Sequence, residues 1–149
     1  VFNILGQKVK QARVLDLFAG TGALGIEAIS RGADHATFID IDCNTIYKNL
    51  ELCDFKENAS VISCDIINGL IPKNLFQQQY DLIFIDPPYD KGYIEQTLEK
   101  QAFPDLLANN GIIIADQSCK ENLRIRLSSL DIYRQKKYSK TLISFMNKI

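Results

Sequence analysis

The sequence predicts an α/β fold, with a mostly parallel sheet of seven strands, helices on both faces and an antiparallel hairpin at the carboxyl end. Two observations predict it. Short apolar runs rich in branched residues alternate with stretches of helical period, which is typical of a parallel sheet covered by helices. Beyond residue 130 two further strand-like runs lie too close in sequence for a crossover helix, so they are expected to form a hairpin.

Five apolar runs are the expected parallel strands: residues 13–18, 36–40, 60–64, 81–85 and 111–115. Helices are expected over about 1–5, about 23–30, through Tyr47 and Leu50, over about 93–107 and over 120–129. Asn109-Asn110-Gly111 is interpreted as the turn before the fifth strand. The expected hairpin pairs residues 131–134 with 141–145 around Tyr138-Ser139-Lys140.

Length and composition fit one domain over residues 1–149, because 46% of the 149 residues are hydrophobic and can fill one core. No apolar run approaches the roughly 20 residues of a membrane-spanning helix, and no signal-peptide pattern opens the chain, so we expect a cytoplasmic protein with no membrane partner. The cysteines form no C-x-x-C pair, which predicts reduced core thiols and no metal site. They are Cys43, Cys53, Cys64 and Cys119.

Charge is divided unevenly along the chain. Residues 1–119 hold 9 Lys and Arg against 16 Asp and Glu, whereas the last 30 residues hold 8 against 2, a balance of +6. The basic end permits contact with phosphates, and a solvated basic face explains it equally well.

Three glycines follow the first expected strand, and their spacing predicts a ligand-binding turn. Gly20, Gly22 and Gly25 match G-x-G-x-x-G at the mouth of a helix, where backbone can approach a ligand closely. Asp40 ends the second strand 20 residues after Gly20, where a carboxylate can accept both hydroxyls of a ribose. This pattern predicts an adenosine-type cofactor but does not separate a dinucleotide from S-adenosylmethionine.

Two further carboxylates favour S-adenosylmethionine. Asp16 precedes the glycines within the first strand, where it would attract an ammonium group and repel a pyrophosphate. Asp65 follows the third strand, where it could accept a hydrogen bond from an adenine amino group. An ion pair or a helix cap would also explain each acid.

Asp86-Pro87-Pro88-Tyr89 follows the fourth strand, beside the point where ligands of such sheets bind. The Asp86 carboxylate and the Pro87 carbonyl could accept the hydrogen bonds of a base amino group, the prolines would fix the loop, and the base could stack on Tyr89. This pattern predicts methylation of an exocyclic amine by direct displacement, without a metal. Asp86 could orient the amine or accept its proton. Tyr93 could border the base pocket or pack its helix, and His35 is assigned no catalytic role.

Together these residues resemble the RsmD family, bacterial enzymes that methylate the N2 amino group of a guanine in 16S ribosomal RNA. The resemblance rests on Val1-Phe-Asn-Ile-Leu, on residues 15–28, on Arg31-Gly-Ala, on Phe38-Ile-Asp-Ile-Asp42 and on Asp86-Pro-Pro-Tyr. It implies a Rossmann-like class I methyltransferase fold, S-adenosyl-L-methionine as cofactor and a target of the guanine-966 type. The implied partner is 16S rRNA or the assembling small ribosomal subunit, and we expect a monomer.

The expected site has two groups of residues. Cofactor contacts are expected from Asp16, Phe18, Ala19, Gly20, Gly22, Asp40, Ile41, Asp65 and Ile66, and catalysis from Asp86, Pro87, Pro88 and Tyr89. Asp40 replaces the glutamate usual in the family, and Ser139 stands where the family tends to have glycine. The family's N-terminal segment rich in Arg and Gly is absent from this sequence, so we expect cofactor binding with weak methylation.

Three alternatives stay open. Asp-Pro-Pro-Tyr also suits enzymes that methylate adenine N6 in DNA or another ribosomal RNA guanine. An NAD-dependent oxidoreductase is compatible with the glycines and Asp40, although it leaves the Asp86 loop unexplained. A binding module could keep the cofactor fold without turnover.

Overall fold

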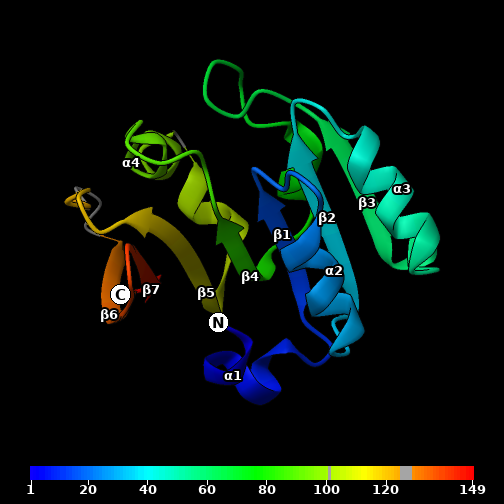
Figure 1. Cartoon of the computed structure of the whole chain (residues 1–149), viewed down its shortest axis with the longest axis horizontal. Helices are drawn as coiled ribbons and strands as arrows, with labels where there is room; N and C mark the ends of the chain where they lie inside the picture. Colours follow the sequence, from blue (N-terminus) through cyan, green and yellow to red (C-terminus); the bar gives the residue numbers. More distant parts are fainter. Residues whose placement is uncertain (101, 125–128) are drawn as a thin grey trace.

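The computed structural model describes residues 1–100, 102–124 and 129–149. Seven strands form one sheet in the order β3-β2-β1-β4-β5-β7-β6 (Figure 1). Strands β1 to β5 are parallel to one another, whereas β7 is antiparallel to both β5 and β6. The predicted mostly parallel sheet with a terminal hairpin is therefore confirmed. The strands are β1 (Arg13–Leu17), β2 (His35–Asp40), β3 (Ala59–Ser63), β4 (Tyr80–Ile85), β5 (Leu107–Ser118), β6 (Leu130–Tyr138) and β7 (Thr141–Lys148).

Helices cover both faces of the sheet, and two apolar cores lie beneath them. The first core packs α1 (Phe2–Leu5), α2 (Ala23–Ser30) and α3 (Asn44–Leu52) against one face. The second packs η3 (Lys73–Gln77), α4 (Tyr93–Leu98) and η4 (Phe103–Leu106) against the other. The short 3-10 helices η1 (Gly6–Val9) and η2 (Lys56–Asn58) complete the list. In the part of the chain that is described, no helix has the length and apolar character needed to cross a membrane.

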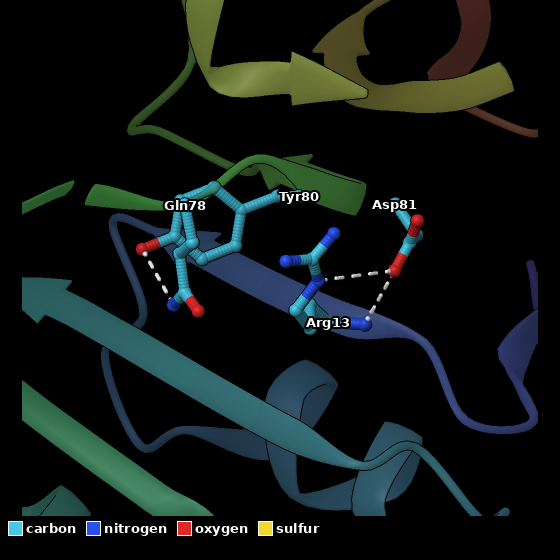
Figure 2. Close-up of polar contacts among 4 residues, drawn as sticks. All are labelled: Arg13, Gln78, Tyr80 and Asp81. Atoms are coloured by element: carbon cyan, nitrogen blue, oxygen red, sulfur yellow. Dashed lines mark hydrogen bonds and ion pairs between the residues drawn. The ribbon is translucent and has the colours of Figure 1, made fainter. Parts of the chain in front are cut away.

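The amino ends of the central strands are joined by polar contacts, shown in Figure 2. The Asp81 carboxylate, at the start of β4, accepts a hydrogen bond of 2.8 Å from the Arg13 backbone nitrogen at the start of β1. The Arg13 Nε lies 3.8 Å from the same oxygen. Nearby, the Gln78 side-chain amide donates to the Tyr80 hydroxyl at 3.4 Å. The two Arg13–Asp81 contacts join β1 to β4 at the edge opposite their carboxyl ends.

The helix predicted over about 93–107 is wrong beyond Leu98, where α4 ends. Ala102 has a left-handed φ of 64°, and Pro104 lies in the first turn of the separate helix η4. Proline lacks the amide hydrogen that a continuing helix requires, and it disfavours helical backbone in the residue before it. The pattern therefore covers two short helices.

The predicted turn at Asn109-Asn110-Gly111 is also wrong, because these residues lie inside β5. The pairing of β5 with β4 shifts its register here, because Tyr80 pairs with Leu107 and Leu82 with Ile112, so β5 has three more residues than β4 over this interval. A Cβ on Gly111 would lie 2.9 Å from the Tyr80 carbonyl oxygen and 2.7 Å from Leu107 Cδ1. Only glycine allows so close an approach, so Gly111 marks an irregular stretch of β5 that passes close to the Tyr80 backbone.

The helix predicted over residues 120–129 is absent from residues 120–124, and residues 125–128 lie outside the described part. Side-chain oxygens, one of them from α4, accept hydrogen bonds from the backbone nitrogens of this segment. Ser118 Oγ accepts from the Lys120 nitrogen at 3.2 Å, and the Glu95 carboxylate accepts from the Arg124 nitrogen at 2.6 Å. Such contacts offer the backbone an alternative to helix.

Two expectations about single residue types have mixed outcomes. The cysteines are free thiols, but only Cys43 is buried in the core, while Cys53 is exposed and the other two are half-buried. His35 opens β2, as predicted, and its Nε2 lies 2.8 Å from Ser60 Oγ on β3. Its contact is therefore at the amino ends of these strands, away from the Asp86 loop.

Candidate active site

A cavity of about 490 Å³ opens at the carboxyl ends of β1, β2, β3 and β4. The strand order reverses between β1 and β4, and ligands of open α/β sheets bind at such a switch point. The cavity is lined by Phe18, Gly20, Ile39, Asp40, Ile41, Cys64, Asp65, Ile66, Ile67, Asn68, Asp86, Pro87, Pro88 and Tyr93. It brings the glycine turn and the Asp86 loop, 66 residues apart in sequence, around one space.

The glycine turn is shaped by packing against β2. Gly22 has a φ of 80°, and the backbone at this position is left-handed where α2 begins. Gly25 lies so close to Phe38 that an added Cβ would overlap the aromatic ring. The expected roles of these glycines, a tight turn and close helix-to-strand packing, are confirmed. Gly22 itself faces Phe38, Ile26 and Ile46 and does not line the cavity.

Phe18 introduces strain at the same turn, because its φ of 60° is left-handed although it carries a side chain. Such backbone in a non-glycine residue is uncommon and gathers at functional sites. The Phe18 ring stacks on Tyr93 of α4, with centroids 6.2 Å apart and planes 7° apart. Both rings line the cavity, so this pair joins the glycine turn to the segment that follows the Asp86 loop.

Asp40 holds the turn through its carboxylate. One oxygen accepts a hydrogen bond from the Gly20 nitrogen at 2.7 Å, and the other accepts from the Ile41 nitrogen at 2.7 Å and from the Asp42 nitrogen at 3.3 Å. Each carboxylate oxygen has two lone pairs, so the oxygen that accepts from Gly20 has one position left for a ligand hydroxyl. Asp40 therefore both shapes the turn and faces the cavity.

Asp65 organises the opposite wall. Its oxygens accept from the Ile67 and Asn68 nitrogens at 3.0 Å each and from the Asn68 side-chain amide at 2.8 Å. These hydrogen bonds, chiefly those from Asn68, lower the pKa of Asp65 below its ordinary value. Lys100 Nζ donates to the carbonyl oxygens of Ile67 and Gly69 at 3.0 Å each and fixes the next residues of the wall.

Asp16 lies behind the turn rather than in the cavity wall. It is 1% exposed, and its carboxylate accepts a hydrogen bond from the Gly25 nitrogen at 2.9 Å. Burial, followed by the charges of Asp86 and Asp40, raises its pKa to about 7, although the Gly25 hydrogen bond opposes this. The direct cavity contact expected of Asp16 is absent here, because its carboxylate is turned toward the first turn of α2.

Asp86, Pro87 and Pro88 line the cavity directly after β4. Pro87 is buried, whereas Asp86 and Pro88 are exposed at the mouth. The pKa of Asp86 is raised to about 6, mainly by partial desolvation and next by the negative charge of Asp116. Asp86 is therefore mostly ionised at neutral pH and available as an acceptor.

Tyr89 is 43% exposed and does not line the cavity. Its hydroxyl donates to the Asp116 carboxylate at 3.3 Å, a long contact that turns the side chain toward the end of β5. Ala19 also stays outside the lining, with its nitrogen donating to the Ile39 carbonyl. Sequence reasoning missed Ile39, Cys64, Ile67, Asn68 and the neighbouring Asp116. Of its two interpretations of Tyr93, the one that placed this residue at the pocket agrees with the structure.

Comparison with known proteins identifies the family of this chain. A family model described as "Conserved hypothetical protein 95" matches residues 1–147. The ribosomal RNA small subunit methyltransferase D of Escherichia coli strain K12 is 31% identical over 139 residues, covering 91% of this chain and 68% of that protein. The chain belongs to the RsmD family. Its membership indicates S-adenosylmethionine as the methyl donor.

Two further relatives agree with this membership. The enzyme of the same name from Buchnera aphidicola subsp. Baizongia pistaciae is 34% identical over 145 residues, covering 95% of this RsmD-family chain and 72% of that protein. A solved structure of a conserved hypothetical protein from Streptococcus pyogenes superposes with a TM-score of 0.81 at 28% identity, covering 99% of this chain and 92% of that one. The fold is therefore that of a Rossmann-like class I methyltransferase, as predicted.

Proposed function

We propose that this chain transfers a methyl group from S-adenosylmethionine to the exocyclic N2 of a guanine in 16S ribosomal RNA. The observation that carries the proposal is the single cavity shared by the glycine turn, Asp40 and Asp86-Pro87-Pro88. Relatives named as small subunit ribosomal RNA methyltransferases support the choice of RNA over DNA. Residues 1–149 act in this proposal as one methyltransferase domain.

The proposed cofactor contacts follow the lining of the cavity. Asp40 accepts a ribose hydroxyl, and the backbone of Gly20 lies against the cofactor, while Ile41 and Ile66 offer apolar contact to the adenine. Asp65 accepts three hydrogen bonds from Ile67 and Asn68, so we assign it first to shaping the adenine wall, with one acceptor position left for the adenine amino group. The exposed Asn68 side chain is a second candidate for the polar edge of the ring.

The proposed chemistry is a direct displacement. The guanine N2 attacks the methyl carbon, a carbon–nitrogen bond forms, the carbon–sulfur bond breaks, and its electron pair neutralises the sulfonium. The positively charged nitrogen then loses one proton to Asp86 or to water. Asp86 and the Pro87 carbonyl accept the amine hydrogens, so they stabilise the nitrogen as it leaves the ring plane and gains charge.

Nucleoside analysis tests the proposal. The protein is incubated with S-adenosylmethionine labelled in its methyl group and with separate pools of 16S rRNA, 23S rRNA and DNA. Label is expected in N2-methylguanosine from 16S rRNA. Label in N6-methyladenine of DNA, or in a base of 23S rRNA alone, would overturn the assignment.

Binding of the cofactor without transfer to any pool would favour a binding module instead. The small ribosomal subunit, assembled without this modification, is included as a fourth substrate, so that a requirement for the particle is not taken for inactivity. Calorimetry with S-adenosylhomocysteine and with NAD is run on the same preparation. Tight NAD binding alone would identify the oxidoreductase alternative.

A further inference from the structure

We propose that strand β6 and the turn after it bind the phosphate backbone of the RNA substrate. The cations assigned to this contact, named the hairpin surface here, are Arg134, Lys136, Lys137 and Lys140. That the bound polymer is RNA rests on the function proposed above. The surface itself follows from the position, charge and exposure of these four residues.

The topology brings the hairpin surface to the edge of the sheet that holds the cavity. The last residue of β5, Ser118, pairs with Thr141, which in turn pairs with Tyr138. The β6–β7 turn therefore lies at the carboxyl ends of β4 and β5, and the Cys119 nitrogen donates to the Lys140 carbonyl at 2.9 Å. From β4 to β6 there are three strand spacings, roughly 14 Å at about 4.8 Å each. A few nucleotides can span such a distance.

The positive charge of the hairpin surface is not neutralised by its neighbours. Across the hairpin, Arg134, Lys136 and Lys137 pair with Phe145, Ile143 and Leu142, none of which is charged. Among the described residues, the ion pairs involve Arg13, Arg31 and Lys56, and none uses a cation of this surface. All four side chains belong to exposed residues, and the nearest acid on the strand is Asp131, at its far end. The cations are therefore available to an external anion.

Aromatic rings lie among these cations. Tyr138 is 40% exposed, and Lys136 Nζ lies 5.1 Å from the centre of its ring. Tyr133 is 47% exposed on the same strand. Exposed rings beside cations are typical of surfaces on which single-stranded bases stack while the backbone meets positive charge. β6 is also the last strand of the sheet, and no strand among the described residues pairs with its outer edge, where side chains from both of its faces can reach a ligand (Figure 1).

The region around the cavity mouth carries the opposite charge. Asp86 lines the cavity, and Asp116 at the end of β5 accepts a hydrogen bond from Tyr89 of the same loop. Asp90 and Glu121 line a neighbouring pocket, and all four carboxylates repel phosphate. When a nucleotide binds at this edge of the sheet, the hairpin surface attracts its phosphates, and the acceptors at the mouth of the cavity bind its base amino group. The two charges together orient the backbone away from the cavity and the base toward it.

Lysines on an edge strand also prevent sheets from joining edge to edge, which would explain the charge without any ligand. The experiment separates these explanations. Lys136→Gln with Lys137→Gln is compared with Lys8→Gln with Lys10→Gln, a control pair of exposed lysines beside the amino ends of the sheet. Both double variants remove two positive charges. A Lys136→Arg with Lys137→Arg variant tests rescue of the charge.

Fluorescence anisotropy measures the dissociation constant for a fluorescein-labelled RNA hairpin with guanines in its loop, over a range of salt concentrations. The Lys136→Gln, Lys137→Gln variant should bind this RNA roughly tenfold more weakly near physiological salt. The plot of the logarithm of the association constant against the logarithm of salt concentration should be less steep by about 1.4, which corresponds to the loss of two phosphate contacts. The control pair and the arginine variant should behave as the wild type. Each variant is also titrated with S-adenosylhomocysteine, whose affinity should be unchanged.

Equal weakening by the control pair would show a non-specific effect of net charge and overturn the proposal. Unchanged RNA affinity of the hairpin-surface variant would overturn it too, and aggregation of that variant would then assign the lysines to edge protection. The result is independent of the proposed function, because binding is measured without turnover. If the protein methylates 16S rRNA but the hairpin-surface variant binds RNA normally, only the proposed function stands. If the variant binds RNA more weakly but no RNA is methylated, only the proposed RNA-binding surface stands.

Discussion

The two regions at the carboxyl edge of the sheet use charge in opposite ways. Around the cavity, carboxylates are engaged by the protein itself, as Asp40 is by the Gly20 nitrogen and Asp65 by Asn68. On the hairpin surface, the cations of β6 face uncharged partners and solvent. The acids around the cavity are held in place by backbone hydrogen bonds, which suits a small cofactor of fixed shape. The cations of β6 can change conformation, which suits contact with the backbone of an extended RNA. Breaking either region should therefore have a different signature.

The largest expected effect concerns Asp16, the most buried acid near the cavity. Its pKa is raised from 3.8 to about 7, so the folded protein binds this proton more tightly than the unfolded chain does. The stabilising contribution is complete below pH 4 and is lost as the pH rises to about 7. The shift of about three pKa units therefore lowers the free energy of unfolding at pH 8 by about 4 kcal/mol relative to its value at pH 4.

Asp16→Asn should remove this pH dependence, because the amide cannot ionise and its oxygen can still accept from Gly25. Urea unfolding of the wild type and the variant between pH 4 and pH 8, without cofactor, measures the difference. A matched control is Asp131→Asn on the exposed start of β6. Parallel curves for Asp16→Asn and the wild type would mean that the buried acid is not the cause.

A second effect separates catalysis from binding at the cavity mouth. Asp86→Ala should lower single-turnover methylation by at least about 100-fold, roughly the loss of one preorganised electrostatic contact, and should retain cofactor affinity. Asp86→Asn should lose less if orientation of the amine is the main role, since its oxygen still accepts one hydrogen bond. Rapid-quench assays with saturating RNA give the rate, and calorimetry gives the affinity. A wild-type rate in Asp86→Ala would remove this residue from the mechanism.

The smallest expected effect is a change in the pKa of Asp86 at the mouth of the cavity when the charge of Asp116 is removed. The pKa of Asp86, about 6, is raised first by desolvation and next by Asp116. If the ionised carboxylate accepts the amine, methylation should rise with pH through this range. Asp116→Asn removes the repelling charge, so the rising limb should move to lower pH, while its amide oxygen still accepts from Tyr89. A pH profile of single-turnover rates measures the shift, and an unmoved limb would show that another group controls it.

Much of the parallel sheet could be predicted because its signals are local. α2 was predicted with the bounds that it has, since its glycine start and its Arg31-Gly32 end both lie in the adjacent sequence. One error arises where a distant contact decides, because Gly111 looks like a turn residue until its closeness to the Tyr80 carbonyl is known. A second error did not need the structure, because Pro104 lies inside the predicted range 93–107 and is itself a local signal that a helix ends.

The candidate site shows the same limit. The motif residues Gly20, Asp40 and Asp86 were predicted because each follows a strand at a recognisable spacing. Asp116 was missed although a signal exists. Ile85 pairs with Ala115, so the acids that follow β4 and those within the end of β5 become neighbours once the register is known. Asn68 has no comparable signal, because the loop that carries it is shaped by Asp65 and Lys100 together.

The contact between Gly25 and Phe38 has a mechanical consequence. Phe38 lies on β2, two residues before Asp40, and its ring occupies the space that a larger residue at position 25 would need. The ring thus fills the space between α2 and β2 and limits how closely the helix can approach the strand that ends in Asp40. Asp40, which we propose contacts the cofactor, therefore lies on a strand packed against α2 through an aromatic side chain that is fully buried in the core.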